Sequence, residues 1–250
     1  MNPLILIPAR MAATRLPDKP LADIGGAPMI VRAWEQAVRS GLPVAVAAGD
    51  PEIVAAIEAA GGVAVLTDPD LPSGSDRIRA ALEAIDPDGA HDAVINLQGD
   101  MPFADPALAR VCADLLAAEP ACDIATLIAP EADASDRSNP DVVKAVVTMG
   151  EGERYGRTLY FTRSTLFGDA PVWRHIGLYG YRRAALERFC AAPPSPLERR
   201  EKLEQLRALE MGLQIWAAVI AEAPLSVDNP DDLAAARAIA GRQQATGNRQ

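Results

Sequence analysis

The sequence has few cysteines, and their spacing excludes two kinds of site. Cys112, Cys122 and Cys190 are the only three, and no two of them form a Cys-x-x-Cys pair. An odd number of widely spaced cysteines predicts neither a disulfide framework nor a zinc site. No Ser/His/Asp spacing or paired cysteine motif indicates a covalent intermediate. We therefore expect free thiols in a reducing cytoplasm.

The chain also lacks an excess of basic charge and any long apolar run. Its formal net charge of -10 argues against nonspecific nucleic acid binding, which depends on a basic surface. Pro8 and Arg10 limit the first apolar run to about five residues, too short for a signal peptide core or a membrane span. We therefore expect a protein that is not exported and does not cross a membrane.

Apolar runs of strand length alternate with amphipathic stretches through the first half of the 250 residues. This alternation predicts an α/β fold with a mostly parallel sheet, flanked by helices on both faces. The predicted strands, all expected to be buried, are 4–7, 44–48, 63–66 and 93–97. After about Pro130, Asp, Asn and Pro become frequent, and β-prone pieces at 142–148, 158–162 and 176–181 predict a smaller strand-rich extension.

Several helices can be predicted from capping residues and apolar spacing. A helix over 105–118 places Cys112 in the core. The capping box Ser195-Pro196-Leu197-Glu198 predicts a helix from there to about Met211. A strand at 214–220 and a closing helix follow, and residues 241–250 are polar and expected to be frayed.

Three cations, Arg10, Arg15 and Lys19, lie on the loop after the first predicted strand. Open α/β sheets bind ligands at this end of their strands, and a cationic cluster in an acidic protein is suited to a polyphosphate. On the charges alone, a solvated surface loop is the alternative. The loop matches neither the G-x-x-x-x-G-K-[ST] nor the G-x-G-x-x-G motif, which also disfavours a dehydrogenase.

Two aspartates follow later predicted strands and suit a magnesium ion. Asp100 ends the segment Asn96-Leu97-Gln98-Gly99-Asp100, and Asp228 follows the last predicted strand. Hard oxygen ligands are those that Mg²⁺ requires. Taken singly, each aspartate is more often a turn residue or a helix cap. The convergence of cations and acids at strand ends favours the functional interpretation.

Polar residues also stand within apolar or amphipathic stretches of the second half, namely His175, Tyr179, Glu204 and Gln205. They could line a pocket for a hydroxylated acid. The alternative is a core tyrosine with a satisfied hydroxyl and a solvated helix face.

Motifs spread over residues 4–238 together carry a family resemblance. They are Pro8-Ala9-Arg10, Arg15-Leu16-Pro17-Asp18-Lys19-Pro20-Leu21, Ser73-Gly74-Ser75-Asp76-Arg77, Gln98-Gly99-Asp100, His175-Ile176-Gly177-Leu178-Tyr179-Gly180-Tyr181-Arg182, Pro194-Ser195-Pro196-Leu197-Glu198, Leu203-Glu204-Gln205-Leu206-Arg207 and Val227-Asp228-Asn229-Pro230-Asp231-Asp232-Leu233. In this order they resemble the 3-deoxy-manno-octulosonate cytidylyltransferases, or CMP-Kdo synthetases.

The resemblance implies a Rossmann-like nucleotidyltransferase, a transferase that moves CMP from CTP to the anomeric hydroxyl of 3-deoxy-D-manno-octulosonate (Kdo). Pyrophosphate is released, Mg²⁺ is the cofactor, and CMP-Kdo serves lipopolysaccharide biosynthesis. The implied catalytic residues are Arg10, Lys19, Asp100 and Asp228, of which the two aspartates hold the metal. The implied nucleotide-binding residues are Pro8, Ala9, Arg10, Lys19, Ser73, Gly74 and Gln98. The implied sugar-binding residues are Arg15, His175, Tyr179, Glu204 and Gln205.

The resemblance also implies a division of the chain and a homodimer. Residues 1–130 with 212–240 would form the nucleotide-binding core, and 131–211 the sugar-binding and dimerisation extension. Met101, Gly49 and a short stretch between Arg163 and His175 depart from the family pattern. A modified Kdo such as an 8-amino form therefore stays open as an alternative substrate. Two separate alternatives are a transferase for another sugar acid such as sialic acid and a noncatalytic nucleotide-binding regulator.

Overall fold

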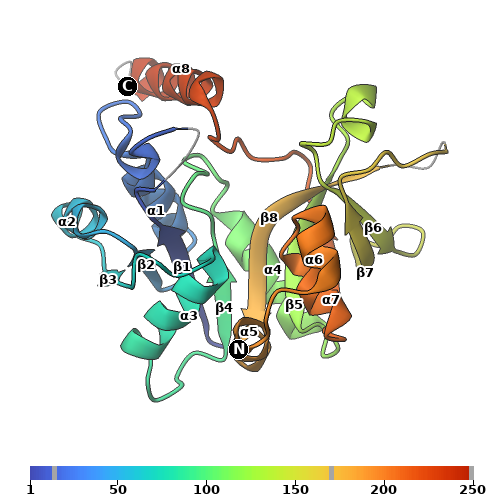
Figure 1. Ribbon diagram of the computed structural model, residues 1–250. Coiled ribbons are helices and arrows are strands. Elements are labelled where there is room, and N and C mark those ends of the chain that lie inside the picture. The colour runs from blue at the N-terminus through green and yellow to red at the C-terminus, as the bar shows by residue number, and fades with distance from the viewer. Residues whose placement is uncertain (13–15, 169–171, 248–250) are drawn as a thin grey trace. The chain divides into compact units, whose positions relative to one another are not determined.

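The computed structural model describes residues 1–12, 16–168 and 172–247, and the chain divides into two compact units (Figure 1). The α/β unit comprises residues 4–90, 96–108 and 224–250, and the strand-rich unit comprises 1–3, 91–95 and 109–223. The strand-rich unit is larger than the predicted extension of 131–211. The reason is that β5 (Ile124–Pro130) and β9 (Ile215–Val219) pair with each other and with its other strands.

The α/β unit is built on three parallel strands, β1 (Pro3–Ala9), β2 (Val44–Ala48) and β3 (Ala64–Leu66). Ile5, Leu6 and Ile7 of β1 have no exposed surface, as expected of a buried strand. The prediction of a buried strand is wrong for β3, where Leu66 is 57% exposed. This strand lies at the end of the strand order and has a neighbour on one side only.

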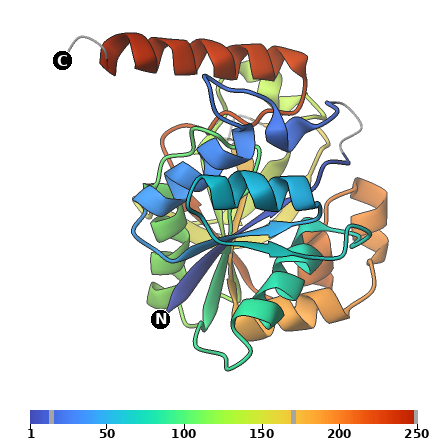
Figure 2. The same ribbon diagram turned by 90° about the vertical axis from the view of Figure 1, so that its left-hand side faces the viewer.

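Helices cover both faces of these strands. Figure 2 shows α1 (Met29–Arg39) and α2 (Pro51–Ala59) on one side and α3 (Gly74–Ile85) on the other. Right-handed crossovers place α1 and α2 on the same face, because the connections through both helices move along the sheet in the same direction. The short 3-10 helix η1 (Lys19–Leu21) follows β1.

Helix α8 (Pro230–Gly247) closes the α/β unit. An apolar cluster that includes Ile24, Met29, Val227 and Leu233 anchors it, and burial of each such side chain contributes about 1.5–3 kcal/mol. The prediction that residue 241 begins a frayed tail is wrong up to Gly247, because the helix continues to that residue. Residues 248–250 lie outside the described part of the chain.

The strand-rich unit contains a mixed sheet in the order β8, β5, β9, β7 and β6. The new strands are β6 (Lys144–Thr148), β7 (Tyr155–Thr162) and β8 (Trp173–Arg182). β5 runs parallel to β9 and antiparallel to β8, while β7 and β6 add antiparallel pairs. β6 also pairs with β8, so the set of pairings closes on itself. The prediction of a mostly parallel sheet is therefore wrong for this half of the chain.

A further short strand is β4 (Ala93–Asn96). The helices of this half are α4 (Ala107–Ala118), η2 (Ala134–Arg137), α5 (Arg183–Ala191), α6 (Pro196–Glu201) and α7 (Gln205–Glu210).

The prediction of a single helix from Ser195 to about Met211 is wrong. Its capping box is present, but Lys202 adopts a left-handed conformation with φ of 54° and separates α6 from α7. Within the described ranges, no helix combines the length and the apolar character that a membrane crossing would need.

Candidate active site

A cavity of about 260 Å³ lies in the α/β unit at the carboxyl end of β1. All seven residues predicted to bind nucleotide line it, together with Asp100 and Arg77. The remaining lining residues are Ala12, Pro20, Met29, Leu71 and Gly99. The structure thus brings the first loop, the start of α3 and the segment after β4 around one concave surface.

Hydrogen bonds of residues 9 and 11 fix the start of the loop that follows β1. The Gly49 N–H donates to the Ala9 carbonyl at 2.8 Å, and the Met11 N–H donates to the Asp50 carboxylate at 2.7 Å. Gly99 permits a close approach on the other side, since a Cβ there would lie 3.2 Å from the Pro8 carbonyl oxygen and 2.9 Å from the side chain of Ile30. These contacts hold Arg10 at the cavity.

Lys19 lies between the two predicted metal-binding acids. Its Nζ donates to Asp100 Oδ2 at 2.9 Å and to Asp228 Oδ1 at 3.1 Å. The Lys19 side chain is 15% exposed. Burial lowers the pKa of Lys19, but the charges and hydrogen bonds of Asp100 and Asp228 outweigh it, so the pKa is raised overall. The ammonium therefore offsets the repulsion between the two carboxylates.

Asp228 reaches this position because it is not the cap of α8. Asn229 accepts hydrogen bonds from the N–H groups of Asp231 and Asp232, and the Asp232 carboxylate accepts from the Asp228 N–H. The Val227 N–H donates to the Asp100 carbonyl at 2.9 Å. This bond brings the segment that carries Asp228 beside Asp100.

The donor set at this position fits a hard divalent cation. Asp100 Oδ1 is buried and has no hydrogen-bond partner among the described residues. The described part of the chain contains no group of three or more His, Cys, Asp or Glu side chains suited to a metal. Two carboxylates are nevertheless enough for Mg²⁺, which commonly takes its other ligands from substrate phosphates and water.

Arg77 was not predicted as a site residue, yet it lines the cavity and is 2% exposed. Its guanidinium donates to the Thr67 hydroxyl and to the carbonyls of Asp68 and Pro69. Burial and then the charge of Arg10 lower its pKa. The helical spacing from Ser73, four residues earlier, could have identified it, because such residues share one face of a helix.

The strand-rich unit holds four of the five residues predicted to bind sugar. On β8, the rings of His175 and Tyr179 lie 5.4 Å apart, and Phe161 contacts His175 edge-on at 4.7 Å. Burial raises the pKa of Tyr179, and electrostatic interaction with Tyr181 and Glu204 adds to the effect. Arg15, the fifth predicted residue, lies outside the described residues.

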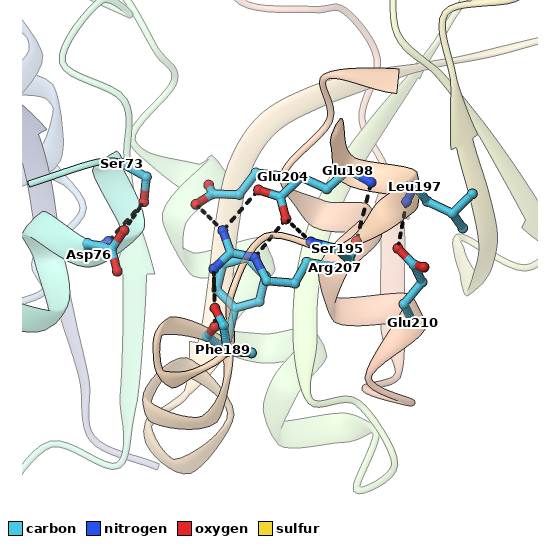
Figure 3. A network of polar contacts seen from close by, with 10 residues as sticks. Ser73, Asp76, Phe189, Ser195, Leu197, Glu198, Glu204, Arg207 and Glu210 are labelled. Carbon is cyan, nitrogen blue, oxygen red and sulfur yellow. Dashed lines mark hydrogen bonds and ion pairs between the residues drawn. The ribbon is translucent and has the colours of Figure 1, made fainter. Parts of the chain in front are cut away.

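Glu204 and Gln205 lie at the start of α7. In the same helix, the buried Arg207 forms hydrogen bonds with several neighbouring segments (Figure 3). Arg207 donates twice to Glu198, at 2.9 and 3.1 Å, and once to Glu204, at 3.2 Å. It also donates to the carbonyls of Phe189 and Ala192, and its guanidinium lies 4.4 Å from the centre of the Phe189 ring. All five of its N–H groups are thus used.

The same picture shows how two serines begin helices. Ser195 and Glu198 cap α6 reciprocally, and Ser73 accepts from the Asp76 N–H at the start of α3 (Figure 3). Ser73 is thus a helix cap as well as a cavity residue, and Gln205 is a buried residue of α7.

The chain resembles known proteins over nearly its whole length. Residues 4–215 match the cytidylyltransferase family. The 3-deoxy-manno-octulosonate cytidylyltransferase of Parvibaculum lavamentivorans is 57% identical over 97% of this chain and 94% of its own length. That of Methylobacterium sp. strain 4-46 is 58% identical over 95% of this chain and 96% of its own length.

Solved structures similar to this chain support the same family. CMP:2-keto-3-deoxy-manno-octonic acid synthetase complexed with CTP aligns with a TM-score of 0.89 and 35% identity, covering 97% of this chain and 100% of that one. A nucleotidyl transferase from Methanothermobacter thermautotroptrophicus, 15% identical with a TM-score of 0.62 over 96% of this chain and 98% of that one, shares the fold. The chain therefore belongs to the cytidylyltransferase family. Within that family it belongs with the 3-deoxy-manno-octulosonate cytidylyltransferases, which confirms the resemblance of its motifs.

Proposed function

We propose that this protein transfers CMP from CTP to the anomeric 2-hydroxyl of Kdo and releases pyrophosphate, as a Mg²⁺-dependent step of lipopolysaccharide biosynthesis. The central observation is the pair Asp100 and Asp228, both bonded to Lys19 beside the cavity that Arg10, Ser73 and Gln98 line. The choice of substrates is supported by the similarity of the chain to proteins named for this reaction and to one whose structure was solved with CTP.

The cavity residues fall into two groups, those that would bind the triphosphate and those that would bind the cytidine. Arg10 and Lys19 supply donors for a triphosphate that carries about four negative charges. Pro8, Ala9, Ser73, Gly74 and Gln98 would hold the cytidine. Mg²⁺ held by Asp100 and Asp228 would neutralise charge on the α-phosphate and the departing pyrophosphate and lower the pKa of the attacking hydroxyl.

The sugar is proposed to contact Arg15, His175, Tyr179, Glu204 and Gln205. Their hydroxyl, imidazole, amide, carboxylate and guanidinium groups suit a polyhydroxylated acid. Positioning of the anomeric hydroxyl in line with the α-phosphate would then supply much of the rate enhancement.

A coupled pyrophosphate assay tests the reaction. The purified protein is mixed with CTP, Mg²⁺ and Kdo, and the assay is repeated with UTP, with N-acetylneuraminic acid, with 8-amino-Kdo and with EDTA. We expect turnover with CTP and Kdo only, and none after chelation. CTP binding without turnover on any sugar would instead identify a noncatalytic regulator.

Substitution of the acids tests the metal assignment. Asp100→Asn and Asp228→Asn are expected to lose most turnover and to weaken Mn²⁺ binding in the presence of CTP, measured by titration calorimetry. Asp114→Asn, an exposed aspartate of α4, is the matched control. Full magnesium-dependent activity in both site variants would show that the assignment is wrong.

We also propose that the protein is cytoplasmic and forms a homodimer through the strand-rich unit. Tyr155 and Leu159 of β7 are 40% and 48% exposed and offer an apolar surface there. Sedimentation velocity should give the mass of a dimer for the wild type and of a monomer for Leu159→Arg. A monomeric wild type would contradict the proposal.

A further inference from the structure

The hydroxyl of Thr126 lies at an irregularity in the sheet of the strand-rich unit. Opposite it, the pairing of β5 with β8 shifts between Thr126–Tyr179 and Leu127–Ile176, so that Gly177 and Leu178 are extra residues. A bulge of this kind leaves backbone groups of the longer strand without their usual ladder partners. Leu178 has no exposed surface and Ile176 is 6% exposed, so their backbone groups are shielded from water.

Thr126 Oγ1 has three neighbours within hydrogen-bond distance. The carbonyl oxygens of Leu178 and Ile176 lie at 2.9 and 3.2 Å, and Nε2 of His175 lies at 3.0 Å. A hydroxyl has one proton, and carbonyl oxygens can only accept. If the Thr126 proton pointed at the imidazole, Oγ1 would face both carbonyl oxygens with no hydrogen between them, which is repulsive, so we infer that the proton is donated to the carbonyls of β8. Toward the imidazole the hydroxyl can only accept, so Nε2 must carry a hydrogen.

We propose that Thr126 is a positioning residue that fixes His175 as the neutral tautomer protonated on Nε2, so that His175 offers Nδ1 as a hydrogen-bond acceptor to a hydroxyl of the bound sugar acid. The sugar contact rests on the proposed function. The tautomer follows from the Thr126 contacts alone, since the bond at one ring nitrogen decides the state of the other.

The surroundings of His175 favour an uncharged ring. Phe161 and Tyr179 pack against it, and its pKa is lowered from 6.5 to about 3 by burial. A neutral acceptor selects a hydroxyl donor and does not pair with the sugar carboxylate. His175 would thus contribute to recognition of the sugar's hydroxyl pattern, and the carboxylate must be bound by cations elsewhere.

Nitrogen spectra of histidine test the tautomer directly. The full-length protein is labelled with ¹⁵N-histidine, and long-range ¹H–¹⁵N correlations are recorded at pH 7. The chain contains two histidines, so a His91→Asn variant assigns both sets of signals. We expect His175 to show a protonated Nε2 and a bare Nδ1 in the wild type and in Thr126→Ser, which keeps the hydroxyl.

Kinetics then test the link to the sugar. In Thr126→Val the spectra should show mixed tautomers, and the KM for Kdo should rise about tenfold, the loss of one hydrogen bond. The KM for CTP should not change. Thr158→Val is the matched control, because the buried Thr158 hydroxyl has no hydrogen-bond partner among the described residues. It should leave both the spectra and the KM for Kdo unchanged.

The outcomes separate the two proposals. A protonated Nδ1 or an imidazolium in the wild type would overturn the inference even if Thr126→Val failed to fold. An unchanged tautomer and unchanged KM for Kdo in Thr126→Val would also overturn it. Absence of turnover with Kdo in a wild type that has the expected tautomer would instead refute the proposed function, and the sugar contact with it.

Discussion

The burial of His175 should make the stability of the protein depend on pH. Burial lowers the pKa of this imidazole from 6.5 to about 3, so the unfolded chain takes up the proton first as the solution is acidified. The contribution is fully present above pH 6.5 and is lost as the pH falls toward 3. Between pH 7 and pH 5 the loss reaches at most about 2 kcal/mol, since each unit below the unfolded pKa is worth about 1.36 kcal/mol.

Urea unfolding of the wild type and of His175→Asn at pH 7, 6 and 5 measures this loss. Carboxylates contribute equally to both proteins, so the difference between their pH profiles isolates His175. The wild type should lose up to about 2 kcal/mol more than the variant over this range. Parallel profiles for wild type and His175→Asn would show that the imidazole is not desolvated in the folded state.

Two further substitutions test the buried arginines. Arg207→Lys supplies three donors in place of five, so we expect a loss of about 2 kcal/mol in the free energy of unfolding, measured in urea. The exposed Arg199→Lys should change it by less than about 0.5 kcal/mol, and equal losses would refute the argument. Gly49→Ala places a Cβ 2.7 Å from Nη1 of Arg77, which three hydrogen bonds hold in place. We expect a loss of about 1–3 kcal/mol and a higher KM for CTP, and an unchanged KM would show that Arg77 can move without effect on the nucleotide.

Local patterns predicted the individual elements well. The strand predicted at 44–48 is β2, and the segment predicted at 142–148 contains β6. The missed strand β5 is an apolar run buried on both faces, with no alternation to distinguish it from a helix. Its partners β8 and β9 are far away in the sequence. The directions of those pairings depend on tertiary arrangement, which is why the mixed sheet was not predictable.

The break between α6 and α7 also has a tertiary cause. The capping box at Ser195 starts a helix, as predicted, but the Glu198 carboxylate is bound by Arg207 from the next helix. A continuous helix would place residues 198 and 207 more than two turns apart, beyond the reach of such a contact. The left-handed Lys202 lets the chain turn back. Helical propensity alone gave no sign of this contact.

The acids at the cavity show the same division between local and long-range information. The segment Asp228-Asn229-Pro230 fits a helix cap, and a cap is indeed present, but Asn229 and Asp232 form it. Asp228 is not the cap residue and contacts Lys19, because Val227 holds this segment in place. The Val227 N–H donates to the Asp100 carbonyl, and the Val227 side chain packs in the apolar cluster that anchors α8. That cluster unites segments from both ends of the chain. The pairing of the acids therefore depends on apolar packing, whereas their chemistry could be read from the residues themselves.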